Sequence, residues 1–202
     1  MPTRSAIIED IEGKHAIGLV KMAYYYFDFR DNKKQDRYGL LSSLILQLSS
    51  ESDSCCNILS KLYSSNNRAR RPTVIALKNC IKDMLSLPGE GPIYIVVDAL
   101  DECPNSSGTP SARREVMELI KELVRLELPN VYLCVASRPE IDIQLVLESL
   151  EPLQVSLDDE MGQRGDIIAY IEHTVRSNST PEWTEKDQGL VIQTLSQKAN
   201  GM

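Results

Sequence analysis

Three carboxylates follow the most apolar short segment of the chain. Residues 93–97 contain no charged side chain and lead directly to Asp98, and Asp101 and Glu102 come three and four positions later. An apolar run without alternation is typical of a parallel strand that is buried on both faces. In such sheets ligands bind beyond the carboxyl ends of the strands. Carboxylates at that edge can hold Mg²⁺ beside a nucleotide phosphate and position a water molecule. The alternative is a solvated acidic loop after a core strand.

A second apolar run ends beside an arginine. Residues 131–136 lead to Arg138, and the segment between the two runs, residues 111–128, has the three-and-four spacing of an amphipathic helix. Strand, helix and strand predict a right-handed βαβ unit, in which both strands end at the same edge of the sheet. Arg138 is therefore expected near the acids. Its planar guanidinium suits a phosphate, and a salt bridge to Asp98 or Asp101 is the alternative.

The elements that position these residues are predicted from periodicity and from helix breakers. We expect a helix from Ser5 to Glu12 that Gly13 closes, and then a strand from Met22 to Phe29. Asp36 is expected to cap the next helix, with a polar loop from Ser49 to Ser54 after it. Further helices are predicted near residues 58–62, 72–85, 140–150, 166–176 and 184–195, the last with a capping box of Thr184 and Asp187, and a short strand at 153–157.

This order of elements predicts an α/β fold with a parallel sheet flanked by helices. Its strands are expected near residues 22–29, 93–97, 131–136 and 153–157. We expect the sheet and its covering helices to occupy residues 1–158, and a helical segment to occupy residues 159–202.

Composition limits the classes of partner. A net charge of −7 and a pI near 5.0 argue against nucleic acid and against an anionic membrane as the main partner. The five cysteines have no C-x-x-C spacing, which favours free thiols. Cys134 is expected to be a small apolar residue in a buried strand, and Cys103 to be structural and not a nucleophile paired with His173. Without a membrane-length apolar stretch or a signal peptide, we expect a soluble cytoplasmic protein.

D-A-L-D-E at the first strand end and A-S-R-P at the second resemble the NACHT branch of the STAND class of P-loop NTPases. The chain is most similar to a fungal group whose domain resembles the N-terminal region of nephrocystin. In that family the Walker B strand has a small residue after the metal-binding acid and further acids three and four positions beyond it. The resemblance implies a three-layer P-loop NTPase-like fold that binds Mg²⁺ with ATP or GTP. It implies that Asp98 is the Mg²⁺ ligand, that Asp101 or Glu102 activates water, and that Arg138 contacts the terminal phosphate.

The family's phosphate-binding motif does not occur in this sequence. G-x-x-x-x-G-K-[ST] lies between the first strand and the first helix of such domains, and no such run is present in the 202 residues. We therefore expect a fragment that lacks that strand and loop, leads toward a winged-helix region, and holds no nucleotide tightly by itself.

Two hypotheses about function follow. The first is part of a nucleotide-hydrolysing signalling switch whose nucleotide state controls self-association and an effector, in fungi often in non-self recognition or cell death. The second is a degenerate, non-catalytic NACHT-like module that keeps the fold for protein contacts.

Overall fold

The computed structural model describes residues 11–65, 71–89, 91–105, 110–152, 161–177 and 183–198. The chain forms two compact units, one of residues 11–152 and the other of residues 1–10 and 153–202. The predicted boundary after residue 158 and the strand predicted at 153–157 both fall in residues 153–160, outside the described ranges.

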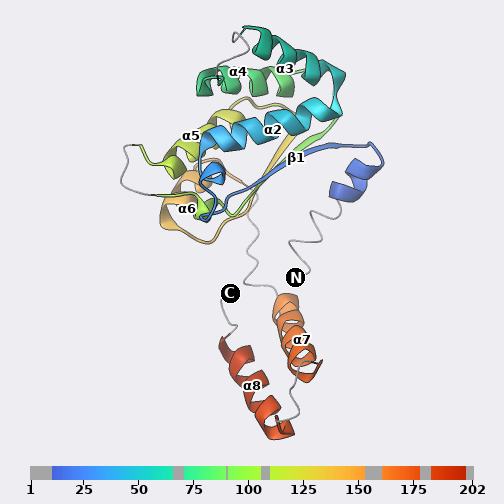
Figure 1. Ribbon diagram of the computed structural model, residues 1–202, viewed down its shortest axis with the longest axis vertical. Coiled ribbons are helices and arrows are strands. Elements are labelled where there is room, and N and C mark those ends of the chain that lie inside the picture. The colour runs from blue at the N-terminus through green and yellow to red at the C-terminus, as the bar shows by residue number, and fades with distance from the viewer. Residues whose placement is uncertain are drawn as a thin grey trace. The chain divides into compact units, whose positions relative to one another are not determined.

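Within the described residues, three parallel strands form the centre of the larger unit (Figure 1). They are β1 (Lys21–Tyr26), β2 (Ile93–Asp98) and β3 (Val131–Val135), in the spatial order β1-β2-β3. In the central strand, Ile95 lies opposite Ala23 of β1 and Leu133 of β3. All residues of β2 except Tyr94 are buried. The predicted α/β fold with a parallel sheet is confirmed.

β1 ends earlier than predicted. The expected strand extended to Phe29, whereas the observed strand ends at Tyr26. The last backbone bond from this segment to β2 is the one from the Phe27 amide to the Asp98 carbonyl, and the next amide, that of Asp28, donates instead to the Lys34 carbonyl at 3.3 Å. This bond closes a turn that contains the short 3-10 helix η1 (Asn32–Lys34).

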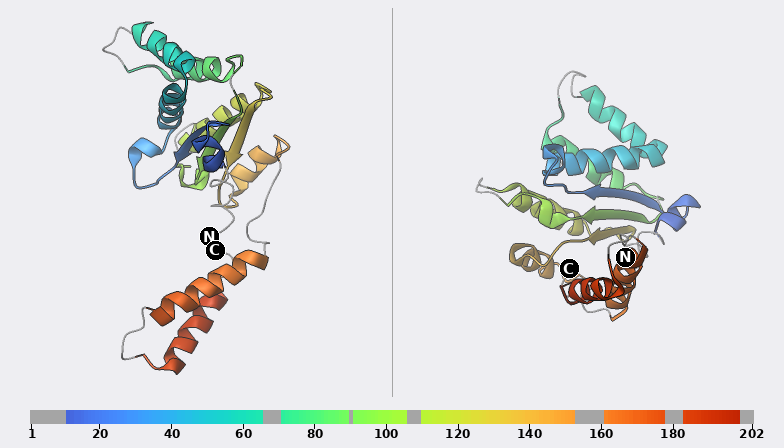
Figure 2. Two further views of the ribbon diagram at one scale, coloured as in Figure 1. Left: turned by 90° about the vertical axis from the view of Figure 1, so that its right-hand side faces the viewer. Right: turned by 60° about the horizontal axis from the view of Figure 1, so that its bottom comes forward.

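Helices flank this sheet, and one of them, α2 (Arg37–Glu51), packs against both the sheet and other helices. The others are α3 (Asp53–Ser65), α4 (Val74–Leu85), α5 (Ala112–Val124) and α6 (Ile141–Glu148). Figures 1 and 2 show α2 beside the sheet, and α3 and α4 on the side of α2 that faces away from the sheet. The apolar stripe of α2 is at most 1% exposed; it consists of Leu40, Leu41, Leu44, Ile45 and Leu48. Its burial between sheet and helices makes α2 the main element of the core.

The two faces of the sheet differ in exposure. Ala23 and Ile95 belong to the core that the sheet shares with the helices, whereas Tyr24 and Tyr132 on the other face are each 48% exposed. Cys134 also lies on this second face and is exposed. The prediction of a buried Cys134 is therefore wrong. Among the described strands β3 pairs with β2 alone, and its side chains alternate between partly buried and exposed.

Helix ends follow the predicted caps in part. The Asp36 side chain accepts a hydrogen bond from the Gly39 amide at 2.8 Å, which confirms the predicted cap of α2. The loop predicted from Ser49 to Ser54 is wrong, because Ser52 alone separates α2 from α3. The hydroxyl of Ser49 donates to a carbonyl of its own helix, so this polar residue is accommodated at a partly exposed helical position.

Gly13 does not end the first helical segment. Residues 11–16 are helical, and the chain leaves the helix at Gly18, which has φ +72°. The Leu19 amide then donates to the Lys14 carbonyl at 3.0 Å. This 6→1 bond is the Schellman arrangement, in which the left-handed residue follows the last turn.

The smaller unit contains α7 (Met161–Ser177) and α8 (Glu185–Lys198) in its described part. The predicted capping box at the start of α8 is confirmed. The Thr184 amide donates to the Asp187 carboxylate at 2.9 Å, and the Asp187 amide donates to the Thr184 hydroxyl at 3.3 Å. None of the helices in the described ranges combines the length and the apolar composition of a membrane span.

Candidate site at the carboxyl edge of the sheet

Asp98 is the last residue of β2 and lies at the carboxyl edge of the sheet. Its side chain accepts a hydrogen bond from the Ala99 amide at 2.7 Å, and the residue is 7% exposed. Its backbone carbonyl accepts a hydrogen bond from the Phe27 amide at 3.1 Å, which joins the ends of β1 and β2. On the other side, partial burial and the charge of Asp98 raise the pKa of the Cys134 thiol on β3. The Asp98 carboxylate therefore lies within electrostatic reach of β3.

A backbone conformation that side chains rarely adopt follows Asp98. Ala99 has φ 53° and ψ 44°, in the left-handed region. This conformation costs roughly 1 kcal/mol for a residue with a Cβ. The chain continues into the 3-10 helix η2 (Leu100–Glu102), and the Leu100 amide donates to the Ala136 carbonyl at 3.1 Å. Contacts to the end of β3 thus hold the turn against its backbone strain.

Asp101 links the end of β2 to the segment after β3. Its Oδ1 accepts hydrogen bonds from the Arg138 amide at 3.0 Å and from the Ser137 hydroxyl at 3.5 Å. Its Oδ2 lies 3.6 Å from Nε of Arg138, and the side chains of Asp101 and Arg138 are 10% and 82% exposed, respectively. The structure therefore brings Arg138 to the acids as a salt bridge, the alternative that the sequence left open.

Glu102 turns toward the end of β1. Its Oε2 accepts a hydrogen bond from the Phe29 amide at 3.3 Å, and the residue is partly exposed. The three predicted acids thus have different surroundings: Asp98 is buried, Asp101 is paired with Arg138, and Glu102 contacts one backbone amide. The structure places all four predicted site residues at one edge of the sheet.

Arg113 contacts the same turn and was not among the predicted site residues. It lies in the first turn of α5 and is 8% exposed. Its Nε donates to the Cys103 carbonyl at 2.9 Å, and its Nη2 donates to the Asp101 carbonyl at 2.6 Å. Its Nη1 lies 3.3 Å from the Asp142 carboxylate. Helical periodicity gave no sign of this role, because an arginine in the first turn of a helix is usually solvated.

Cys103 packs under the turn. The residue is 0% exposed, and its thiol donates a hydrogen bond to the Gln35 carbonyl at 3.3 Å. Burial raises the pKa of the Cys103 thiol to about 12, against the opposing effect of the Arg113 charge. Because the thiolate is the nucleophile, this thiol is unreactive near neutral pH.

The cysteines of the folded protein should differ in alkylation. With iodoacetamide at pH 8, we expect rapid labelling of Cys56, slower labelling of Cys134 and no labelling of Cys103 or Cys80. Cys56 and Cys134 are exposed, whereas burial raises the pKa of the Cys80 thiol to about 11. Peptide mass spectrometry measures the four rates, and denaturant should equalise them. Labelling of Cys103 as fast as Cys56 in the folded protein would contradict its burial beneath the turn.

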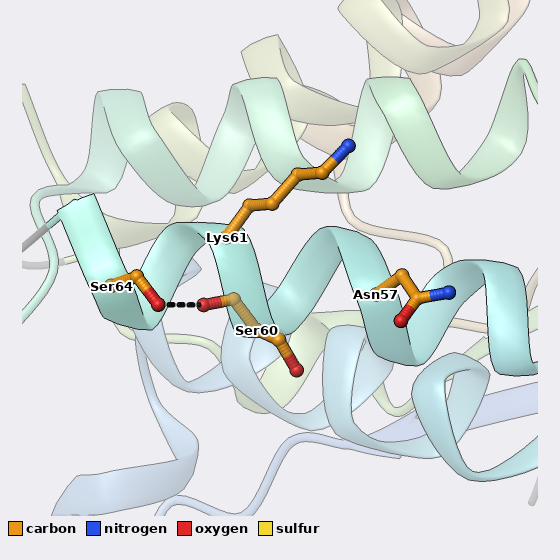
Figure 3. Close-up of a pocket in the computed structure, with 4 residues that line it drawn as sticks. All are labelled: Asn57, Ser60, Lys61 and Ser64. Carbon is orange, nitrogen blue, oxygen red and sulfur yellow. Dashed lines mark hydrogen bonds between the residues drawn. The ribbon is translucent and has the colours of Figure 1, made fainter.

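A polar depression lies elsewhere, on α3. Asn57, Ser60, Lys61 and Ser64 line it, all from one helix (Figure 3). These residues are exposed, and their spacing is that of a single solvated helix face. The depression holds none of the predicted site residues.

Carboxylate and guanidinium groups, the kinds of side chain that contact metal ions and phosphates, lie at the carboxyl edge of the sheet. Among the residues that the structure describes, no group of three or more His, Cys, Asp or Glu side chains is arranged to hold a metal ion. Mg²⁺ beside phosphates typically uses one or two protein carboxylates, and carboxylate oxygen is a ligand that it prefers. Asp98 offers such oxygens at the end of β2, and Arg138 offers a cation for phosphate.

A known protein family matches the larger part of the chain. The model of the family described as "Nephrocystin 3, N-terminal" matches residues 3–138, which is more than half of the chain and includes all four predicted site residues. The predicted resemblance to the N-terminal region of nephrocystin is confirmed. No curated protein and no solved structure matches the chain.

Proposed function

This chain belongs to the nephrocystin 3 N-terminal family, and we propose that it is part of a nucleotide-dependent signalling switch of the NACHT type, within the STAND class of P-loop NTPases. The ligand is Mg²⁺ with ATP or GTP, bound at the carboxyl edge of the sheet. Nucleotide state then controls self-association or contacts with other domains of the same protein. We propose that the switch acts in a fungal protein, in non-self recognition or cell death.

The observation that carries the proposal is the meeting of the two strand ends. Residues 98–103, which we call the acidic turn, begin at the end of β2. The contacts of Asp101 with the Arg138 amide and guanidinium join this acidic turn to the segment after β3. Carboxylates and an arginine at adjacent ends of parallel strands lie where ligands of open α/β sheets bind. The family match over the same residues supports this interpretation.

The environments of the side chains suggest their roles. Asp98 is the proposed Mg²⁺ ligand, because it ends the central strand. Bound Mg²⁺ would neutralise phosphate charge. Arg138 is the proposed phosphate contact, since its exposed guanidinium can leave Asp101 for an anion of the ligand. Glu102 is preferred over Asp101 as the acid that accepts a proton from water, because both carboxylate oxygens of Asp101 already contact the Ser137–Arg138 segment.

One observation favours a non-catalytic protein-interaction module. The amide and the guanidinium of Arg138 both contact Asp101, so these two residues form a structural junction between the strand ends that needs no ligand. The sequence also contains no G-x-x-x-x-G-K-[ST] run to donate backbone amides and a lysine to phosphates. In this alternative the family fold serves protein contacts, and the acids have no metal to bind.

A titration of ¹⁵N-labelled protein with Mg²⁺-ATP and Mg²⁺-GTP separates the two functions. We expect chemical-shift changes at the amides of residues 98–102 and of Ser137 and Arg138. The expected dissociation constant is about 1 mM or weaker, equivalent to a binding free energy of roughly −4 kcal/mol. The affinity is this low because each missing charge-assisted hydrogen bond removes roughly 1.5–3 kcal/mol.

Two controls define a specific result. ATP with a chelator should cause no shift at these amides, because the three acids repel a triphosphate that lacks its metal. Mg²⁺ alone should cause only small shifts, since the phosphates supply the remaining ligands. Shifts confined to the α3 depression around Lys61, or none up to about 10 mM ligand, would support the protein-interaction module.

A further inference from the structure

Besides Asp98, the buried charged residue in the described part of the chain is Arg113. A buried guanidinium is costly unless its donors find acceptors. Here Nε and Nη2 donate to the carbonyls of Cys103 and Asp101, and Nη1 donates to Asp142. Two of the three acceptors are backbone groups of the acidic turn, so this arginine makes more than an ordinary ion pair.

The two carbonyls belong to the residues on either side of Glu102. Their hydrogen bonds to Arg113 measure 2.9 Å for Cys103 and 2.6 Å for Asp101. Because a guanidinium is planar and its donors point in fixed directions, it sets both the separation and the orientation of these carbonyls. The backbone around Glu102 is therefore held from the α5 side, while its side chain reaches the Phe29 amide on the β1 side.

The far end of the guanidinium is also held. Asp142, in the first turn of α6, accepts from Nη1 and also from the Asn105 side-chain amide at 3.1 Å. Asn105 in turn accepts from the hydroxyl of Ser111, the N-cap of α5. A network of polar groups thus connects α5, α6 and the chain that follows the acidic turn.

We infer that Arg113 is the positioning residue of the acidic turn, which it holds by bridging the carbonyls on either side of Glu102. Arg113 acts on a ligand only through Glu102 and Asp101. For the effect of Arg113 on nucleotide binding, this inference rests on the proposed function. The effect of Arg113 on the turn can be measured without any ligand. A lysine cannot replace it, because one ammonium group cannot hold two carbonyls in a fixed relative orientation.

Hydrogen exchange of individual amides in the whole chain tests this inference. In Arg113→Lys and Arg113→Met, the amides of Leu100, Glu102 and Cys103 should exchange about tenfold faster or more, which is roughly 1.4 kcal/mol of lost protection. These amides donate to Ala136, Ala99 and Leu100, respectively. The amide of Ile95 in β2 is the reference for global opening. Arg114→Met is the matched control, because Arg114 is the exposed neighbour of Arg113 on the same helix.

The outcomes separate positioning from general stability. Equal acceleration of the turn amides and of Ile95 would mean that Arg113 only stabilises the fold, and unchanged turn amides would mean that it does not position them; either result overturns the inference. If Arg113→Met does not fold, hydrogen exchange in Arg113→Lys tests the inference alone, since lysine keeps the positive charge beside Asp142. In the Mg²⁺-ATP titration, Arg113→Lys should bind more weakly than the unaltered chain. If the unaltered chain binds no nucleotide, the proposed function fails while the exchange result still stands.

Discussion

Replacing Asp98 by asparagine is expected to weaken Mg²⁺-ATP binding about tenfold or more. Charge-assisted contacts contribute roughly 1.5–3 kcal/mol, and 1.4 kcal/mol is a factor of ten in affinity. Asparagine keeps the Oδ1 that accepts from the Ala99 amide, so the turn should persist. The NMR titration measures the change in affinity, and a thermal melt checks the fold.

The sign of the effect without Mg²⁺ identifies its cause. Asp98→Asn removes one negative charge from an acidic edge, which by electrostatics alone would favour ATP. A metal-ligand role predicts weaker binding with Mg²⁺ and equal or stronger binding with a chelator. If Asp98→Asn tightened binding in both conditions, Asp98 would act only as a repelling charge and the proposed Mg²⁺ role would be wrong.

Glu102→Gln is the matched control for the same experiment. It also exchanges a carboxylate for an amide, and its Oε atom can still accept from the Phe29 amide. Binding of Mg²⁺-ATP should stay within about a factor of two, because water activation acts mainly in the transition state. Any turnover should fall by roughly 10²–10⁴, the usual contribution of a general base. If Asp101→Asn stopped turnover and Glu102→Gln did not, the two roles would be exchanged.

The strand-end motifs were predictable because they depend on local sequence. A charge-free run before Asp98 and another before Arg138 indicate strands of a parallel sheet, and the parallel direction of a βαβ unit places both ends at one edge. The structure shows the ends of β2 and β3 joined by Asp101 and Arg138. The geometry of the edge therefore follows from pattern and topology.

Other features depend on tertiary contacts that no local pattern records. Arg113 reads as a helix-surface residue, yet it bridges two carbonyls of a turn about ten positions earlier. Cys134 lies in an apolar run, but among the described strands β3 has a neighbour, β2, on one side only, and Cys134 is exposed. The serines from Ser49 onward suggested a loop, yet they lie at partly or fully exposed positions at the end of α2, at the start of α3 and between the two helices.

Gly39 presents a further requirement that periodicity does not reveal, and its replacement by alanine should destabilise the larger unit by about 1–3 kcal/mol, the usual cost of overpacking. A Cβ at this position of α2 would lie 2.4 Å from the Lys33 carbonyl oxygen and 2.6 Å from the Tyr25 hydroxyl. The first is a backbone atom of η1, and the second ends a side chain that is 6% exposed and packs against Phe27. Neither can move without disturbing its own contacts.

Gly13→Ala is the matched control, since Gly13 lies in the helical segment 11–16 and a Cβ there would meet nothing within 4 Å. Intrinsic helix propensity favours alanine over glycine by about 1 kcal/mol, so this change should leave stability equal or higher. For Gly39→Ala the same gain is outweighed by the close contact with Lys33. Urea unfolding measures both differences. If Gly39→Ala were as stable as Gly13→Ala, the close approach of η1 to the first turn of α2 would be wrong. Asp36, the cap of α2, also lies between η1 and that turn. The path of the chain from β1 into the helical layer would therefore be wrong as well.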